Sequence, residues 1–449
     1  MEREIVVGID IGTTKIAVFI GSRNEEGEPI ILGMGKSESI GVDRGVVKNI
    51  EQTANSIQKA VQEAEEKTGY IVREVFVGIA GHQIRNIQHR GQIMLESKGH
   101  IIKDSDVNRL IKDQHNLVLN AGEKIIHVIP QSFIVDGETG ITSPVGVPGS
   151  CLEGNFNIIT GNIINIENIY RSVEIAGYKV RNLILEPIAS AEAVVDASEK
   201  EAGVCLVDIG GGTTDIAIFH EGILRHTAVI PLAGNVITED IKEGCSIIKT
   251  QAEALKCRFG SCLAASARED EIIAIPGFRG REPREISMKT LAGIIQARMQ
   301  MILEQVLFEI KSKGYERKMI AGIVLSGGGA KMKDIVQLSE FISGIDARIG
   351  TPHDHLGGTI TEEMTHPMHA TGIGLLLEGL KEIEKEDKIG GSKMAEKIEE
   401  DAPITHEPIV EPEPEETEVS NNNKDPKKGR MSGVIDNFLK NLFKDDGVE

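Results

Sequence analysis

Two stretches of this chain place aspartate, glycine and threonine at spacings that suit phosphate binding. Residues 204–220 read VCLVDIGGGTTDIAIFH, so that one apolar run ends at Asp208 and a second begins at Ile216. Two β-type runs on either side of a glycine turn predict a β-hairpin. Turn glycines bring backbone N–H groups close to an anion, and threonine hydroxyls add further donors. The turn residues expected to hold phosphate oxygens are Gly210, Gly211, Gly212, Thr213 and Thr214.

The carboxylate of Asp208, at the end of the first run, is expected to face a hydrated Mg²⁺ that bridges phosphate oxygens. A Walker A loop and a dinucleotide fingerprint both open a helix. The run after these glycines has no helical period, which excludes both. Taken alone, the hairpin fits an ordinary glycine-rich turn equally well.

The N-terminus repeats the pattern. Residues 6–20 read VVGIDIGTTKIAVFI, with Asp10 in the place of Asp208. A repeat of this length favours a duplicated structural unit over chance, and two such hairpins facing each other would clamp a polyphosphate from both sides. Asp10 is the second expected position for water-bound Mg²⁺. The phosphate contacts expected in this turn are Gly12, Thr13, Thr14 and Lys15.

A third glycine turn follows the apolar stretch 321–325 and is expected to pack on adenosine through Gly327, Gly328 and Gly329. Glu186 stands where a predicted strand, 180–185, meets a predicted helix. It is either a plain capping acid or the group that orients the water attacking a terminal phosphate. The small residues of 189–193 and of 369–377 (HATGIGLLL) predict two helices that pack closely against each other.

Glu253 and Lys256 share one face of a helix predicted over 247–259. They form either a surface ion pair or, with Gly234, part of the wall around the base or ribose. Four histidines, His353, His355, His366 and His369, raise the question of a metal site. No acid or thiol completes a ligand set there, which disfavours metal binding.

Composition limits the class of protein. A length of 449 residues is too long for one core, and a hydrophobic content of 40% is typical of globular proteins. The formal charge of −20 argues against a nucleic-acid partner. Five cysteines match no zinc spacing, which favours reduced thiols in the cytosol. No run suits a transmembrane helix, and the first residues enter a predicted strand rather than a signal peptide.

The C-terminal residues predict a short amphipathic helix over 431–446. Apolar side chains recur there at helical spacing, with lysines at the edge of the stripe. The preceding acidic, proline-interrupted stretch, 381–430, is expected to be a disordered linker. We interpret the helix as an anchor on an anionic membrane, with docking on a protein groove as the alternative. The residues expected in the lipid are Val434, Ile435, Phe438, Leu439, Leu442 and Phe443.

The order of these pieces is similar to that of the actin, DnaK-chaperone and sugar-kinase superfamily. Within it, the chain resembles the FtsA family of bacterial cell-division proteins. The resemblance lies in a β-rich insertion at 82–162, in EPIASAEAVV with LVDIGGGTTDIAIF, and in the acidic linker before an amphipathic helix. It implies an α/β, actin-like, two-lobed nucleotide-binding fold made of duplicated ribonuclease-H-like domains. The implied subdomains are 1A (1–81, 163–195 and 354–380), 1C (82–162), 2A (196–226 and 307–353) and 2B (227–306).

The resemblance also implies a function. Members bind ATP between the lobes with Mg²⁺, turn it over slowly at most, and polymerise as actin-like protofilaments. They tether the C-terminal tail of the tubulin-like FtsZ to the cytoplasmic side of the inner membrane at the division site, and recruit later division proteins. Arg298 is the position matched to a basic residue that takes part in FtsZ binding. The alternatives are an actin-like pilus-assembly or cell-shape scaffold and, less favoured, a sugar-kinase-like enzyme.

Overall fold

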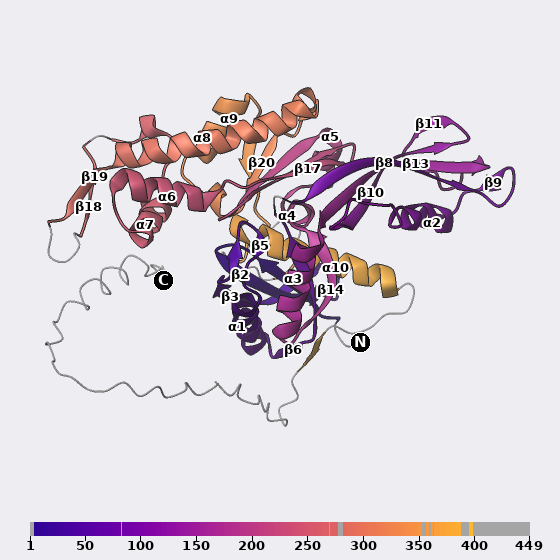
Figure 1. The fold of residues 1–449 in the computed structure, drawn as a ribbon, viewed down its shortest axis with the longest axis horizontal. Coiled ribbons are helices and arrows are strands. Elements are labelled where there is room, and N and C mark those ends of the chain that lie inside the picture. Colours follow the sequence, from indigo (N-terminus) through magenta and orange to yellow (C-terminus); the bar gives the residue numbers. More distant parts are fainter. Residues whose placement is uncertain are drawn as a thin grey trace.

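Two five-stranded sheets with the same topology form the centre of the molecule (Figure 1). The computed structural model describes residues 4–81, 83–268, 270–276, 282–352, 356–358, 361, 363–387 and 395–397. In each sheet the first strand pairs antiparallel with the second, the second antiparallel with the third, and the last two run parallel to the first. The duplication expected from the two hairpins therefore extends over two whole sheets.

The first sheet has the order β3-β2-β1-β7-β14. Its strands are β1 (Val6–Ile11), β2 (Lys15–Arg23), β3 (Pro29–Glu38), β7 (Glu74–Ile79) and β14 (Lys179–Leu185). The second has the order β17-β16-β15-β20-β21. Its strands are β15 (Val204–Ile209), β16 (Thr214–His220), β17 (Ile223–Ile230), β20 (Ile323–Ser326) and β21 (Ala347–Ile349). We call the first sheet with its helices the first lobe, and the second sheet with its helices the second lobe.

Helices cover both faces of the first sheet because its strands alternate two apolar sets. Val7 and Ile9 pack with α1 (Ile50–Thr68) and α3 (Ile163–Ile175). Val6 and Phe76 pack on the other face with α10 (Ala370–Asp387). Short strands β4 (Val42–Asp43), β5 (Val46–Val47) and β6 (Tyr70–Val72) complete this lobe.

An inserted subdomain extends from the first lobe (Figure 1). Its antiparallel sheet, in the order β11-β10-β13-β8, packs on α2 (Asp104–Gln114). The strands of the subdomain are β8 (Arg85–Met94), β9 (His100–Ile101), β10 (Glu123–Val135), β11 (Glu138–Ile141), β12 (Pro148–Gly149) and β13 (Cys151–Asn162). Ile129 and Ile159 of this subdomain join the same hydrophobic cluster as Leu206 and Leu224 of the second lobe. The insertion therefore shares a core with the second lobe and is not an independent appendage.

The second lobe carries a helical subdomain between β17 and β20. The core there is formed by apolar residues of α6, α7 and α8, including Ile237, Leu255 and Ile295. Its elements are α6 (Gly234–Cys245), α7 (Lys249–Phe259), β18 (Ile272–Ile275), β19 (Arg284–Ser287) and α8 (Met288–Ser312). The lobe also contains α5 (Ala197–Ala202), α9 (Ile335–Ser343) and 3₁₀ turns at Ala264–Ser266, Glu316–Lys318, Gly328–Lys331 and Pro367–His369.

Helices α4 (Glu186–Val194) and α10 cross at the centre of the molecule, as the small-residue pattern predicts. A Cβ added to Gly374 would lie 1.7 Å from the carbonyl oxygen of Ala189, so only glycine fits there. This contact confirms the expected close packing of the two helices.

The linker was predicted to begin at residue 381, but the helix before it is longer than expected. Helix α10 continues to Asp387, because Ile383 is buried and nearby acidic residues find partners. Glu382 accepts a hydrogen bond from Asn182, and Glu384 pairs with Arg23 at 3.0 Å. Strand β22 (Ala395–Lys397) then pairs with β6. The rest of the linker and the predicted helix 431–446 lie outside the described residues. Among the helices that are described, none has the length and apolar character needed to span a membrane.

Candidate functional site

A cavity of about 330 Å³ lies between the two lobes and collects most of the predicted site residues. Both hairpin turns line it, together with the glycine turn 327–329 and the starts of α4 and α6. Its lining includes Asp10, Gly12, Thr13, Thr14, Lys15, Glu186, Asp208, Gly210, Gly211, Gly212, Thr213, Gly234, Glu253, Lys256, Gly327, Gly328 and Gly329. Thr214, which was also predicted, is buried beside the turn and donates its hydroxyl to the carbonyl of Leu232.

The two hairpin turns touch each other. A Cβ on Gly211 would lie 2.1 Å from Oγ1 of Thr14, and a Cβ on Gly212 would lie 2.5 Å from Oγ1 of Thr13. The turns therefore approach so closely that a side chain at either glycine would displace a threonine of the other turn. The expectation of two facing hairpins is confirmed by this contact.

Hydroxyl groups from both central helices hold Asp208. Ser190 of α4 donates to Oδ2 of Asp208 at 2.8 Å, and Thr371 of α10 donates to the same oxygen at 3.3 Å. Burial raises the pKa of Asp208, while these two hydrogen bonds oppose the rise. Sequence reasoning assigned no role to either hydroxyl, although both lie in the small-residue stretches that it marked as helix contacts.

Lys15 of the first hairpin reaches the 3₁₀ turn Pro367–His369, which directly precedes α10. Its ammonium donates to the carbonyl of Met368 at 2.9 Å and lies 3.1 Å from Nδ1 of His369. Because an ammonium can only donate, Nδ1 accepts and the imidazole is neutral. Burial lowers the pKa of Lys15 to about 8 and raises the pKa of Asp10 to about 6.

The histidines form no metal site in the part of the chain that the structure describes. That part contains no group of three or more His, Cys, Asp or Glu side chains able to hold a metal ion. His369 contacts Lys15, and desolvation lowers its pKa to about 3. His353 and His355 lie outside the described residues.

Glu186 is the first residue of α4 and lines the cavity. A Cβ on Gly78, in β7, would lie 3.0 Å from Cγ of Glu186, so this glycine leaves space for the side chain. Desolvation and, next in size, the nearby charge of Asp10 raise the pKa of Glu186 well above its ordinary value. The structure therefore places a carboxyl group with raised proton affinity beside the two phosphate-type turns.

Asp215 is a cavity residue that the sequence interpretation missed. Thr213 donates to its Oδ2 at 3.0 Å, whereas Oδ1 is buried without a hydrogen-bond partner among the described residues. Desolvation, followed by the charge of Asp208, raises its pKa to about 8. The sequence did contain a signal. The first turn reads Thr-Thr-Lys and the second reads Thr-Thr-Asp, so the repeat exchanges a cation for an acid at equivalent positions.

The glycine turn after β20 packs directly on the second hairpin. Gly327 has φ +79°, and a Cβ there would lie 2.3 Å from Oδ1 of Asp208. A Cβ on Gly329 would lie 2.4 Å from Cγ2 of Ile209. The backbone of this turn therefore forms one wall of the cavity without side chains in the way.

The comparisons with known proteins agree with this geometry. The family described as "Cell division protein FtsA" matches residues 205–374, and "SHS2 domain inserted in FTSA" matches residues 81–160. The cell division protein FtsA of Pseudomonas aeruginosa is 38% identical over 378 residues, which cover 84% of this chain and 90% of that protein. This chain belongs to the FtsA family. It is a cell-division protein. Membership of this family excludes the pilus-assembly, cell-shape and sugar-kinase alternatives.

Two solved structures identify the wider fold. The PilM-PilN type IV pilus biogenesis complex matches with a TM-score of 0.61 at 15% identity, covering 84% of this chain and 98% of that chain. MreB5 of Spiroplasma citri bound to ADP matches with a TM-score of 0.52 at 15% identity, covering 87% of this chain and 100% of that chain. The fold of this FtsA family member is therefore actin-like, as predicted.

The Glu253–Lys256 pair is not the surface ion pair left open as an alternative. Lys256 is only 8% exposed, and its ammonium donates to the carbonyl of Gly234, the hydroxyl of Thr238 and the carboxylate of Glu253. The backbone N–H of Gly234 in turn donates to the carbonyl of Gly210. The lysine therefore ties helix α7 to the start of α6 and, through α6, to the second hairpin.

Arg298 lies away from the cavity, on α8. Its guanidinium binds the carboxylate of Asp240 on α6 through two hydrogen bonds of 2.5 and 2.9 Å. This charge pair is only partly exposed. In this FtsA family member the predicted partner-binding residue thus already has an internal carboxylate partner, and a peptide acid would have to share it or compete with Asp240.

Proposed function

We propose that the cavity between the lobes binds ATP with Mg²⁺ and that the nucleotide fixes the orientation of the lobes relative to each other. The observation that carries the proposal is the convergence of three glycine turns and five carboxyl groups on one cavity. The turns at 12–14 and 210–214 hold phosphate oxygens, and Gly327, Gly328 and Gly329 pack on adenosine, with Glu253, Lys256 and Gly234 beside it. The related fold of MreB5, which was solved bound to ADP, supports a nucleotide as the ligand.

The acidic residues of the cavity fit a Mg²⁺ ion held through water. Mg²⁺ keeps several water ligands and binds through one or two carboxylates plus substrate phosphates. Asp10 and Asp208 supply two such carboxylates. When bound, the ion would offset the negative charge of phosphate oxygens and of these side chains. Asp215, whose buried Oδ1 has no partner among the described residues, is suited to a water of the ion's shell.

Glu186 is proposed to orient the water that attacks the terminal phosphate. The ATP turnover expected of the protein is slow at most. Burial and the neighbouring carboxylates raise the pKa of Glu186, which favours its binding of a proton. A bound cation would oppose that rise. A scaffold of this kind uses the nucleotide mainly as a conformational ligand.

At the level of the cell, we propose a filament that links FtsZ to the membrane. The chain polymerises as an actin-like protofilament on the cytoplasmic side of the inner membrane at the division site. The subdomain 227–306, with Arg298, binds the C-terminal tail of FtsZ, and later division proteins join the assembly. The predicted helix 431–446 binds anionic lipid.

Two experiments test these proposals separately. Calorimetry with ATP and Mg²⁺ is expected to show one site per chain, and absence of binding would contradict the nucleotide proposal. Anionic vesicles carrying the protein are expected to recruit a fluorescent FtsZ tail peptide. The variant Arg298→Ala is expected to reduce recruitment. The control variant, Arg109→Ala on the inserted subdomain, is expected to leave recruitment unchanged. Equal recruitment by both variants would remove Arg298 from the proposal.

A further inference from the structure

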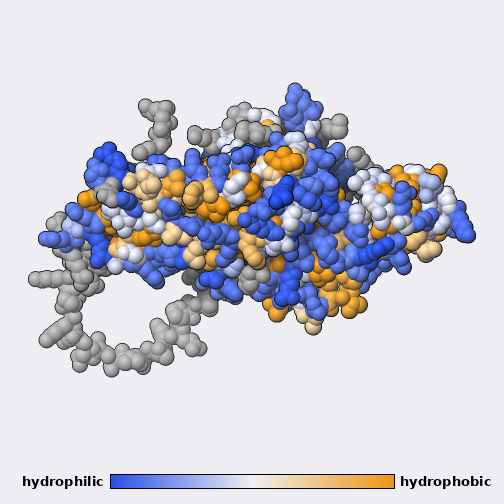
Figure 2. Space-filling view, turned by 90° about the horizontal axis from the view of Figure 1, so that it is seen from above, coloured by the Kyte–Doolittle hydropathy of each residue, from blue (hydrophilic) through white to orange (hydrophobic). Residues whose placement is uncertain are grey.

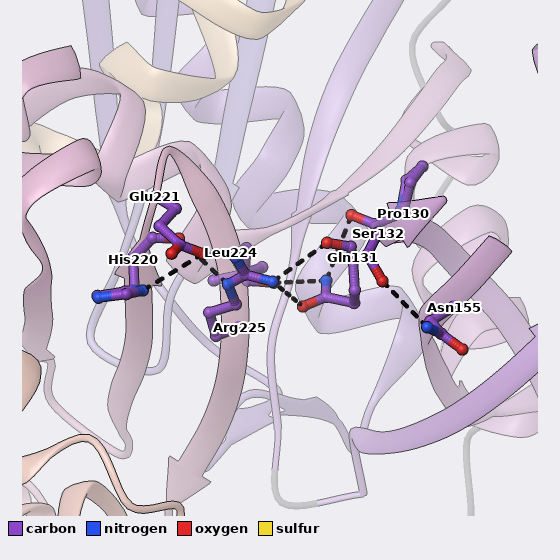
Figure 3. A network of polar contacts seen from close by, with 8 residues as sticks. All are labelled: Pro130, Gln131, Ser132, Asn155, His220, Glu221, Leu224 and Arg225. Atoms are coloured by element: carbon purple, nitrogen blue, oxygen red, sulfur yellow. Dashed lines mark hydrogen bonds and ion pairs between the residues drawn. The ribbon is translucent and has the colours of Figure 1, made fainter. Parts of the chain in front are cut away.

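Strand β10 belongs to the inserted subdomain but contacts both lobes. Near its beginning, Nε2 of His127 lies 3.0 Å from the backbone nitrogen of Leu185 in the first lobe. Four residues later, Gln131 contacts β17 of the second lobe (Figure 3). The side-chain amide of Gln131 donates to the carbonyl of Leu224 at 2.9 Å, and Arg225 donates to the carbonyl of Gln131 at 3.2 Å. One strand therefore connects the two lobes outside the nucleotide cavity.

The His127 contact falls at the junction from which Glu186 projects. Leu185 is the last residue of β14 and the N-cap of α4, so Glu186 is the next residue in the chain. Strand β14 is at the edge of its sheet and, among the described strands, pairs only with β7. An N–H on the open edge of a strand needs a partner from elsewhere when it is buried. The imidazole of His127 provides that partner.

The imidazole acts here as a neutral acceptor. Nε2 accepts the Leu185 N–H, so the ring proton of the neutral tautomer is on Nδ1. Burial lowers the pKa of His127 to about 4, which keeps Nε2 free of a proton at neutral pH.

We propose that His127 is a positioning residue for Glu186, and that the inserted subdomain is in this way part of the hydrolytic site. The proposal rests on the water-orienting role of Glu186 given above. By fixing the N–H of Leu185, His127 sets the direction in which α4 begins and therefore where the Glu186 carboxyl group lies in the cavity. Because the same strand is attached to the second lobe through Gln131, the placement of Glu186 depends on how the lobes are arranged.

The test compares His127→Phe, which keeps a ring but removes the acceptor, with His127→Gln, which keeps an acceptor oxygen. His89→Ala, on strand β8 of the same sheet, is the matched control. Single-turnover hydrolysis of ATP, calorimetric ATP affinity and hydrogen exchange of a peptide spanning 183–190 are measured on the full chain. His127→Ala is a second acceptor-free variant if the phenylalanine disturbs packing.

We expect His127→Phe to slow hydrolysis by about tenfold, with ATP affinity within about twofold of wild type and faster exchange in 183–190. His127→Gln is expected to restore most of the rate, and His89→Ala to match wild type. Adding His127→Phe to Glu186→Gln is expected to cause no further slowing, since both changes act through one group.

Several results would overturn the proposal. These are a wild-type hydrolysis rate in both acceptor-free variants, equal slowing in His127→Gln, or additive slowing in the double variant. A wild-type protein that binds ATP without hydrolysing it would also overturn it, while leaving the proposed nucleotide binding in place. A wild-type protein that does not bind ATP would refute the proposed function itself.

Discussion

Asp215 stands directly opposite Asp208 across the second hairpin, so that the antiparallel register places two carboxyl groups side by side on the cavity wall. Like charges at directly opposite positions repel each other. Burial adds a desolvation cost, and Asp215 therefore has a pKa raised to about 8. In the absence of a bound cation, Asp215 of the folded protein therefore keeps its proton at pH values at which an unfolded aspartate has lost it.

This relationship predicts a pH-dependent gain from Asp215→Asn. Between about pH 4, where an unfolded aspartate titrates, and about pH 8, the folded state binds more protons, so the free energy of unfolding falls as pH rises. The asparagine amide of the variant does not titrate, so this fall in the free energy of unfolding is absent. In nucleotide-free, Mg²⁺-free buffer we expect the variant to be more stable than wild type by about 1–3 kcal/mol at pH 8, and by clearly less at pH 5.

Thermal or urea unfolding at the two pH values provides the measurement. The matched control is Asp113→Asn on the surface of α2, which is expected to change stability little at either pH. A gain of equal size at pH 5 and pH 8 would show that the charge of Asp215 is not the cause.

Asp208→Ala is expected to abolish binding of ATP with Mg²⁺ while the fold survives. The change removes the carboxylate proposed to face the hydrated ion and leaves Ser190 and Thr371 able to hydrogen-bond each other, since their hydroxyls lie 2.9 Å apart. Calorimetry measures the affinity. Ser190→Ala, which removes only one donor to Asp208, is the graded control and is expected to weaken binding by a few-fold. Unchanged affinity in Asp208→Ala would remove this aspartate from the proposed site.

Local patterns predicted the hairpins, the glycine turns and the two central helices, because strand period and turn chemistry are encoded over a few residues. The repeat of Asp10 at Asp208 also predicted that the hairpins face each other. What could not be predicted depends on distant contacts. The burial of Lys256 requires Thr238 and Gly234 to converge on it, and the length of α10 depends on partners such as Arg23 and Asn182. The contact of His127 with Leu185 likewise depends on how the insertion docks.

Because α4 and α10 are in close contact where they cross, we expect one added methyl group there to lower the stability of the fold markedly. In Gly374→Ala the new Cβ would overlap the carbonyl oxygen of Ala189, so the helices must move apart and we expect a loss of roughly 2–4 kcal/mol. Gly293→Ala in α8 is the matched control, since a Cβ there meets nothing within 4 Å. It is expected to stabilise by about 0.5–1 kcal/mol, as alanine favours a helix interior. Thermal unfolding of both variants checks the prediction, and similar melting temperatures would contradict it.

The outer end of the inserted subdomain is predicted to make a filament contact. Met94 and Ile101 are 70% and 60% exposed there, and Figure 2 shows apolar surface on this end of the molecule. Changing both to Asp is expected to raise the protein concentration needed for filaments on lipid by at least about tenfold, with ATP affinity unchanged. Electron microscopy and pelleting measure assembly. Val118→Asp, which is exposed on the same subdomain but outside this end, is the control, and normal filaments from the Met94 and Ile101 variant would refute the contact.

The last prediction concerns the tail, whose residues lie outside those described by the structure. From Met431 the sequence reads MSGVIDNFLKNLFKDD, in which two phenylalanines and five aliphatic side chains share one face of the predicted helix. Insertion of this face into a bilayer is worth several kcal/mol, at about 1.5–3 kcal/mol for each large side chain that is fully buried. A single helix of this kind binds reversibly, and assembly adds avidity. Phe438→Asp with Leu442→Asp is expected to release the protein from anionic vesicles in a flotation assay, without change in ATP affinity. Asn437→Asp with Asn441→Asp adds the same charge on the polar face and is expected to retain most binding. Flotation of the first variant with the vesicles would show that the helix is not the anchor, and equal release of both would assign the effect to charge alone.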